Sequence, residues 1–260
     1  MNHQMHHFDM GLWLLFLAYI VSVTGSVVGL ACTRQSAASD QRDRLRWLAM
    51  ASIAIGGVAI WLMHFIAMLG FAIPNSVVRY NLGWTVASAV LSISAVFVGL
   101  ITIGRTFHLP RLIAGGVITG LAVALMHYTG MWAVQIQGTV AYDKGLVALS
   151  ILIAVVAATA ALWFTLVLES PLLRFVAGLV MGVAVVGMHY TGMAAVRVTV
   201  DHTAPVPGGP EVFSFLFPVF VIGLLALAVP ITAVMLASDR VATASQSAPR
   251  PVASSAGRHR

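Results

Sequence analysis

Seven long apolar stretches divide the chain, and short segments rich in polar residues separate them. A helix needs about 20 apolar residues to cross the hydrocarbon core of a bilayer. The interiors of the stretches contain no Asp, Glu, Lys or Arg. The pattern predicts an all-α membrane protein with seven transmembrane helices, near residues 11–32, 47–70, 83–104, 112–136, 146–168, 172–196 and 212–237.

The composition agrees with a location in the membrane. Hydrophobic residues make up 60% of the 260 residues and charged residues 8%, which leaves too few polar side chains to cover a soluble globule. No Lys or Arg precedes the first apolar stretch and no small-residue cleavage site follows it, so we expect a retained helix and not a signal peptide. Residues 238–260 are rich in Ala, Ser, Pro and Arg, and we expect a disordered basic cytoplasmic tail without an output domain.

The basic residues are distributed unevenly between the two sets of loops. Short loops rich in Lys and Arg stay in the cytoplasm, which predicts that the amino terminus is outside and the carboxyl terminus inside. We attribute the net charge of +6 to arginines that face anionic lipid, because no nucleic-acid signature is present. The outer side has three basic residues, Arg79, Lys144 and Arg197. The inner side has eleven arginines, namely Arg34, Arg42, Arg44, Arg46, Arg105, Arg111, Arg174, Arg240, Arg250, Arg258 and Arg260.

A histidine motif recurs three times inside the apolar stretches. Met-His-Tyr-Thr-Gly-Met occurs at 126–131 and 188–193, and Met-His-Phe-Ile-Ala-Met occurs at 63–68. The histidines are nearly equally spaced (127 − 64 = 63; 189 − 127 = 62), which indicates a repeated two-helix unit. We predict that the seven helices comprise three tandem two-helix repeats plus one leading helix. The sensor-type membrane domain is expected over 11–203, and the seventh helix with its outer loop over 204–237.

The three histidines are predicted to lie at one depth. They follow the inner arginines by 18, 16 and 15 residues, which places them roughly 22–27 Å from the inner edge at the rise of an α-helix. Repeats of two helices insert with the same orientation, so a threefold axis along the membrane normal can bring equivalent side chains together. Small residues at matched positions, which predict close helix packing, are Gly57, Gly120 and Gly182 before the histidines and Ala67, Gly130 and Gly192 after them.

The motif offers nitrogen and sulfur ligands for a metal. An ionisable residue inside a membrane span is a candidate functional residue. The methionine four residues after each histidine shares its helix face, which pairs His64 with Met68, His127 with Met131, and His189 with Met193. The methionines that precede the histidines, Met63, Met126 and Met188, are rotated by about 100° and suit a neighbouring helix interface equally well.

Imidazole and thioether ligands favour copper over magnesium, calcium or manganese, which prefer oxygen ligands. Zinc is disfavoured, because the usual cysteine, carboxylate or His-Glu-x-x-His patterns are absent. Haem held by two of the histidines is the main alternative metal cofactor. The alternative without a metal is that the histidines make hydrogen bonds between helices and the methionines fill gaps in the packing.

Two further features bear on metal chemistry. Residues 1–10 form a His-rich segment on the predicted outer side, with His3, His6 and His7, and this segment is either a place of metal capture or simply a mobile terminus. Cys32 is the only cysteine, so no internal disulfide can form.

With Met-His-Tyr-Thr at 126–129 and 188–191, the chain resembles the MHYT family of bacterial integral membrane sensors over residues 9–203. The resemblance implies a protein of the bacterial cytoplasmic membrane with a copper site near the outer face, proposed to sense oxygen, carbon monoxide or nitric oxide. The first motif lacks Tyr and Thr, and output would require a cytoplasmic signalling partner or the short tail. The ligand set implied is Met63, His64, Met68, Met126, His127, Met131, Met188, His189 and Met193.

Other classes of function can be compared with the sensor. A copper-handling protein, either a chaperone or an assembly factor, is the first alternative. A transporter is weaker, because only Ser and Thr supply polar groups in the inner half of the spans. An enzyme is not expected, because no nucleophile, general base or second cofactor motif is present. A purely structural membrane protein is the remaining alternative.

Overall fold

The computed structural model describes residues 11–73 and 76–247, so the His-rich segment 1–10 lies outside the described residues. Seven helices in this part of the chain are long and apolar enough to cross a membrane, which confirms the prediction. The second span consists of three consecutive helical segments. The helices are α1 Trp13–Ala38, then α2 Gln41–Ser52, η1 Ile53–Leu62 and α3 Met63–Met68 in the second span, α4 Leu82–Ile103, α5 Leu109–Ala133, α6 Lys144–Val167, α7 Pro171–Ala194 and α8 Val212–Ser247.

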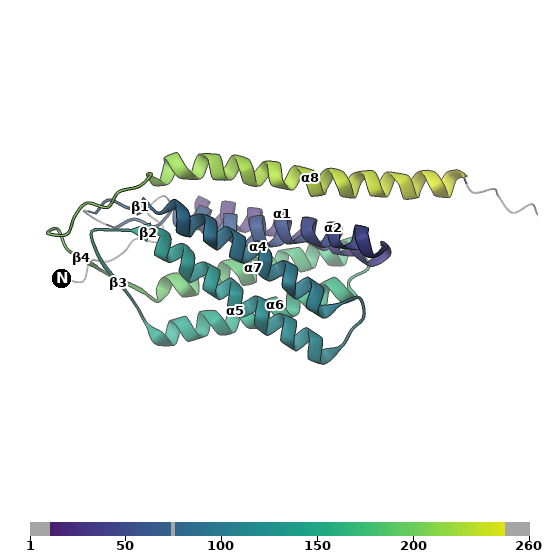
Figure 1. The fold of residues 1–260 in the computed structure, drawn as a ribbon, viewed down its shortest axis with the longest axis horizontal. Helices are drawn as coiled ribbons and strands as arrows, with labels where there is room; N and C mark the ends of the chain where they lie inside the picture. Colours follow the sequence, from purple (N-terminus) through teal and green to yellow (C-terminus); the bar gives the residue numbers. More distant parts are fainter. Residues whose placement is uncertain (1–10, 74–75, 248–260) are drawn as a thin grey trace, which may run out of the picture.

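Six spans form a closed ring, and α8 lies outside it (Figure 1). Each span packs against the next one along the chain from α1 to α7, and α7 packs against α1 to close the ring. The ring therefore consists of three antiparallel pairs, and each pair ends in one copy of the histidine motif. The first helix, predicted to lead the repeats, pairs with the second span, whereas α8 packs on the outside against α1 and η1.

The two ends of the bundle differ in structure. At one end, which we call the strand end, β1 pairs with β2 and β3 with β4, both antiparallel. These pairs connect the segments that follow the three motifs, and the sequence analysis did not predict them. The alternation of valines with polar residues at 196–200 is the signal that marks β4. The strands are β1 Arg79–Tyr80, β2 Val134–Gln135, β3 Gly138–Tyr142 and β4 Val196–Val200.

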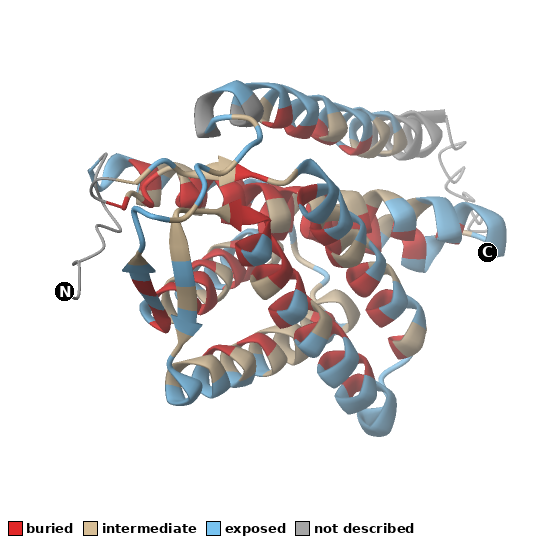
Figure 2. Ribbon diagram, turned by 60° about the vertical axis from the view of Figure 1, so that its left-hand side comes forward, coloured by how far each residue is buried: buried red, intermediate tan, exposed pale blue. Residues whose placement is uncertain are grey.

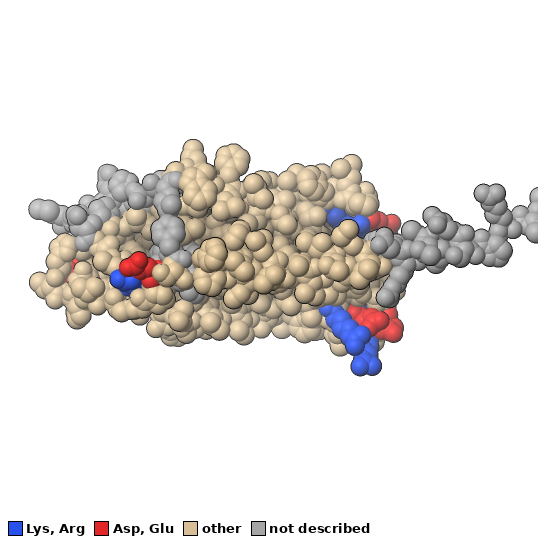
Figure 3. All heavy atoms as spheres, turned by 90° about the horizontal axis from the view of Figure 1, so that it is seen from above, with Lys and Arg blue, Asp and Glu red and all other residues tan. Residues whose placement is uncertain are grey.

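The opposite end, which we call the arginine end, contains the turns between α1 and α2, α4 and α5, and α6 and α7. All described members of the predicted inner arginine set whose side chains can be placed lie in or next to these turns, from Arg34 to Arg174. On the face shown in Figure 3, the charged side chains lie near the two ends, and an uncharged band separates them. The charge pattern thus matches that of a protein that spans a bilayer.

The helices of the ring are buried on the faces that point inward and exposed on the faces that point outward (Figure 2). Many of the exposed residues are large and apolar. Phe16, Leu152 and Val183 each expose more than half of their surface. Exposed apolar area on this scale is unfavourable in water and favourable in lipid. The chain is therefore a multi-pass membrane protein whose outer surface contacts lipid.

Side-chain caps explain where several helices begin. The carboxylate of Asp40 accepts a hydrogen bond from the Asp43 amide before α2, and Asp143 accepts from two amides at the start of α6. The Asn81 side chain accepts from the Trp84 amide before α4. Pro171 opens α7, where the missing amide hydrogen has no consequence.

At the carboxyl end, α8 continues to Ser247. The first ten residues of the segment predicted to be disordered, 238–247, are therefore helical, which corrects the predicted boundary. A helical backbone satisfies its own hydrogen bonds, so it can continue beyond the apolar stretch. Residues 248–260 lie outside the described part of the chain.

The second span contains a ten-residue π-helix, η1, which the sequence analysis did not predict. A π-helix places more residues in each turn than an α-helix and changes which residues face a neighbour. Gly56, and not the predicted Gly57, makes the close approach, because a Cβ at Gly56 would lie 2.7 Å from the Ser92 carbonyl oxygen. The Ser92 hydroxyl in turn donates to the Gly56 carbonyl at 2.7 Å.

We expect Gly56→Ala to lower the free energy of unfolding by about 1–3 kcal/mol, because backbone atoms of α4 must move to admit the methyl group. The adjacent Gly57→Ala is the matched control, since its Cβ would meet the side chains of Ile93 and Ile53 at ordinary contact distances of 3.5 Å and 4.0 Å. Thermal or denaturant unfolding of the two variants in detergent measures the difference. Equal stability of the two variants would show that η1 does not set this packing.

Candidate metal centre

Three buried histidines meet at the centre of the ring. His64 lies in α3, His127 in α5 and His189 in α7, each 1% exposed. The ring centroids lie 5.0 Å apart for His64 and His127, 5.0 Å for His64 and His189, and 5.2 Å for His127 and His189. The rings are nearly perpendicular to one another, at 78–83°. This nearly equilateral triangle agrees with the threefold relation that the repeat predicted.

The Nδ1 atoms of the three rings converge. Nδ1 of His64 lies 3.0 Å from Nδ1 of His189 and 3.2 Å from Nδ1 of His127. A neutral imidazole has one nitrogen with a hydrogen and one nitrogen with a lone pair in the ring plane. Between neutral rings, Nδ1 of His64 can therefore make a good hydrogen bond to only one of its two neighbouring Nδ1 atoms.

A metal ion fits the same three atoms. With metal–nitrogen bonds of about 2.0 Å, three nitrogens around one ion lie about 3.5 Å apart, a few tenths of an ångström from the separations observed here. The candidate ligand atoms of the three histidines all lie within 4.8 Å of one another. Small rotations of the rings would bring three lone pairs onto one cation, which removes the conflict between the nitrogens.

Two of the three histidines pack on the motif of the next repeat. A Cβ at Gly130 would lie 2.5 Å from Nε2 of His64, and a Cβ at Gly192 would lie 2.5 Å from Nε2 of His127. Ala67 occupies the equivalent position in the first repeat. The absence of a side chain at the two glycines thus provides the space for two of the three rings, which gives these predicted small residues a role at the site itself.

The far nitrogens of two histidines have no hydrogen-bond partner among the described residues, namely Nε2 of His64 and Nε2 of His127. Metal-bound histidines usually donate this second N–H to a carbonyl or carboxylate, which fixes the ring. Here the rings are held by packing instead, because the neighbouring positions are glycine and aromatic side chains.

An aromatic ring follows each histidine and touches it edge to face, at centroid distances of 4.9, 4.9 and 5.0 Å. The three rings are Phe65, Tyr128 and Tyr190, so the contact is the same whether or not a hydroxyl is present. Tyr128 places its hydroxyl 2.7 Å from that of Ser150, away from the histidine nitrogens. This contact was not predicted from the sequence, although an aromatic residue follows the histidine in all three motifs and is the signal that indicates it.

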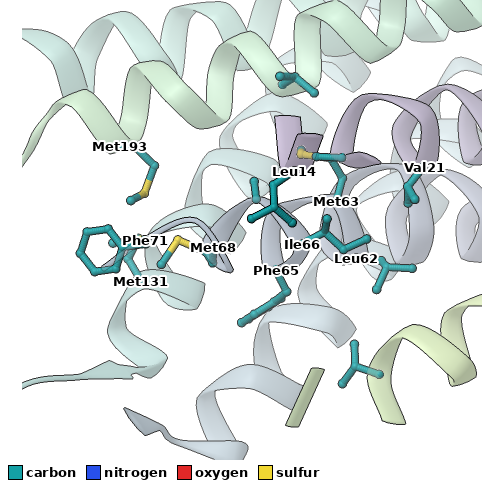
Figure 4. Packing of buried hydrophobic residues seen from close by; sticks show 14 of the residues in the cluster. Leu14, Val21, Leu62, Met63, Phe65, Ile66, Met68, Phe71, Met131 and Met193 are labelled. Carbon is teal, nitrogen blue, oxygen red and sulfur yellow. The ribbon is translucent and has the colours of Figure 1, made fainter. Parts of the chain in front are cut away.

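The methionines four residues after the histidines form a second layer. Met68, Met131 and Met193 are buried in one apolar cluster, and Figure 4 shows them beside Phe71. All three follow their histidine toward the strand end, about 6 Å further along the helix. Side chains lean toward the amino terminus of their helix, so these thioethers lean back toward the histidine layer.

The methionines that precede the histidines are separated from one another. Met63 lies in the same apolar cluster as Met68 but next to Leu14 (Figure 4). Met126 and Met188 belong to a second cluster, on the side of the arginine end. This distribution supports a packing role for all three, as the rotation of about 100° along the helix allows.

Comparison with known proteins places this geometry in a family. The MHYT family, described as a bacterial signalling protein N-terminal repeat, matches at residues 57–116 and 120–178. No solved structure matches the chain significantly.

Three curated relatives resemble most of this chain. The bifunctional diguanylate cyclase/cyclic di-GMP phosphodiesterase MucR of Pseudomonas aeruginosa is 38% identical over 190 residues, which is 71% of this chain and 27% of that protein. The cyclic di-GMP phosphodiesterase NbdA of the same organism is 34% identical, with 74% of this chain and 25% of that protein covered. The signaling protein YkoW of Bacillus subtilis is 33% identical, with 80% and 26% covered.

The chain spans about a quarter of the length of these relatives. The two repeats that the family model matches contain the first and second histidine motifs, with His64 and His127, and the third motif follows them at residues 188–193. The repeat, the seven apolar helices and the shared motif lead to one conclusion: the chain belongs to the MHYT-domain family of bacterial integral membrane sensor proteins.

Proposed function

We propose that the protein is a membrane sensor whose three motif histidines hold copper, and that the centre responds to a diatomic gas such as oxygen, carbon monoxide or nitric oxide. The observation that carries the proposal is the convergence of the Nδ1 atoms of His64, His127 and His189 within a buried, apolar shell. A buried cluster of imidazoles without a carboxylate partner is costly unless a cation or hydrogen bonds satisfy it.

The ligand chemistry supports copper over the other metals. Imidazole nitrogens and thioether sulfurs suit copper, and the ligand set proposed is His64, His127 and His189 with sulfur from Met68, Met131 or Met193. Haem is disfavoured, because imidazole centroids only 5.0–5.2 Å apart leave no room for a macrocycle between the rings. Bound copper would supply an open coordination position and a change of oxidation state.

The histidines belong to three different helix pairs, so the site can couple a ligand to helix movement. A gas biases the arrangement of the pairs only through its different affinity for the two arrangements. His64 is the second residue after the end of η1 at Leu62. The π-helix η1 packs closely against α8, because a Cβ at Gly223 of α8 would lie 2.5 Å from the Leu62 side chain. Movement at the site can thus reach the helix that leads toward the carboxyl terminus.

The orientation and output complete the proposal. Because the turns at the arginine end carry most basic residues, we place that end in the cytoplasm of a bacterium and the metal centre near the outer face of the inner membrane. MucR and NbdA are named for reactions of cyclic di-GMP. We propose output of the same signalling class through a cytoplasmic partner or further domain, and no enzymatic role for the membrane domain.

A copper chaperone or assembly factor is the second candidate. It is favoured by the second layer of buried methionines, which resembles a site for storing a soft metal ion. A transporter is less well supported, because the space below the histidines is apolar and its lining hydroxyls bond to backbone carbonyls.

Metal analysis tests the proposal. The protein should contain copper after purification with copper(I), and a His64→Ala, His127→Ala, His189→Ala variant should lose it. Carbon monoxide or nitric oxide should change the optical or electron paramagnetic resonance spectrum reversibly in the parent protein only. Equal copper in the two proteins would refute the site, and copper without any spectral response to a gas would favour the copper-handling alternative.

Substitution of the methionines separates the two layers. Replacing Met68, Met131 and Met193 together by Leu should weaken copper(I) binding about tenfold or more, a loss of about 1.4 kcal/mol, because sulfur is removed while volume is kept. The matched control replaces Met63, Met126 and Met188 by Leu and should leave the affinity unchanged. A larger loss in the control would place the sulfur ligands in the preceding positions.

The glycine contact offers a single-atom test of the ring position. Gly192→Ala should push the His127 ring aside and lower copper affinity by about 10–100-fold, as other changes in the shell around metal ligands do. Gly187→Ala on the same helix is the control, because nothing lies within 4 Å of its Cβ. Competition with a copper(I) chelator measures both affinities, and equal values would contradict the described packing.

A further inference from the structure

A cavity lies directly below the histidine triangle, toward the arginine end. It has a volume of about 60 Å³ and is lined by residues of η1, α4, α5, α6 and α7. Ile60, Val123 and Val185 line it, and each precedes its histidine by four residues. One helical turn, about 6 Å, therefore separates the top of the cavity from the three imidazoles.

The walls of the cavity offer no free polar group among the described lining residues. The Thr119 hydroxyl donates to the Ala95 carbonyl at 3.4 Å, and the Thr165 hydroxyl donates to the Leu162 carbonyl at 2.7 Å. The other lining side chains are apolar. An apolar cavity of this kind stays dry, although one water needs only about 10–15 Å³.

Small side chains create the space. On α6, Ala154, Ala157, Ala158 and Ala161 all line the cavity, and their spacing of three or four residues puts them on one helix face. Ala184 faces them from α7. Leucine or valine at these positions would fill the interior of the ring, so the alanines keep open a volume next to the histidines.

The opposite approach to the histidines is filled. Toward the strand end, Met68, Met131 and Met193 pack with Phe71 in one buried cluster, below the segments that the strand pairs connect. A small apolar molecule can therefore approach the histidines more easily through the cavity on the side of the arginine end than through the packed cluster on the side of the strand end.

We propose that this cavity is a binding chamber for a small apolar molecule of the size of a diatomic gas, which reaches the histidine nitrogens between Ile60, Val123 and Val185. The delivery of this molecule to a metal at the histidines rests on the proposed function, whereas its binding in the chamber does not. Dispersion contacts with the lining hold the occupant, since no hydrogen bond or charge is available. The chamber excludes water and ions and so selects for uncharged gases.

Xenon tests the chamber without any metal. Xenon-pressurised crystals or xenon-129 magnetic resonance of the protein in nanodiscs should show one site between α6 and α7. Ala158→Leu and Ala184→Leu, on different helices, should each abolish it, and two variants guard against a folding defect in one. Val156→Leu is the matched control, because Val156 is 60% exposed on the lipid side of α6.

The kinetics of gas binding give a second measurement. In the copper(I)-loaded protein, each cavity variant should slow carbon monoxide association about tenfold, equal to about 1.4 kcal/mol in the barrier, while copper content stays unchanged. The triple His→Ala variant should lose copper and keep xenon. That result would separate a failure of the metal site from a failure of the chamber.

The chamber would be overturned by xenon binding that persists in both leucine variants, by xenon density elsewhere in the protein, or by a lipid acyl chain in the cavity. Loss of xenon in Val156→Leu as well would show a general effect on the fold and would equally contradict the assignment. Xenon at the predicted place, with loss in the two variants only, would establish it.

Discussion

The meeting of three imidazoles on one axis is the constraint on which the other features of the bundle depend. His64, His127 and His189 come from three separate helix pairs, and their centroids are 5.0–5.2 Å apart. Three helices can approach an axis this closely only if small residues face it, and Gly130 and Gly192 meet this need. The closed ring, the strand pairs and the buried methionine layer together hold the three histidine motifs at the same level along the axis.

The second and third repeats each provide a candidate ligand and also the surface against which another candidate ligand packs. The ring of His64 lies on Gly130 of the second repeat, and the ring of His127 lies on Gly192 of the third. A displacement of one helix pair therefore changes the position of its own imidazole and the space available to a neighbour's. Such mutual dependence is suited to a switch, because the three pairs cannot shift independently around a shared ligand.

The first repeat differs from the other two in ways that the structure explains. Its motif keeps Met63, His64 and Met68 but replaces Tyr-Thr-Gly by Phe-Ile-Ala. Phe65 still makes the edge-to-face contact with its histidine, so the ring and not the hydroxyl is common to all copies. The π-helix η1 precedes this motif only, and it brings Gly56 against α4 while α8 packs on the other side of the span.

Much of the architecture follows from the sequence alone. Seven spans, the threefold repeat and the convergence of His64, His127 and His189 are determined by hydrophobic length and by the equal spacing of the motifs. Span length and motif spacing are periodic features of the sequence, so they can be identified before any contact between the helices is known. The pairing of Met68, Met131 and Met193 with the histidines was likewise predicted from the helical repeat of four residues, and their ligand role stays a prediction.

Only the tertiary structure decided the remaining features. The register of η1 depends on how Gly56 packs against α4, and the strand pairs form between loops more than 50 residues apart. The helix outside the ring is α8, because α1 closes the ring against α7. The cavity below the histidines exists because alanines from α6 and α7 face one another. Each of these depends on distances between segments remote in the chain, which local periodicity does not encode.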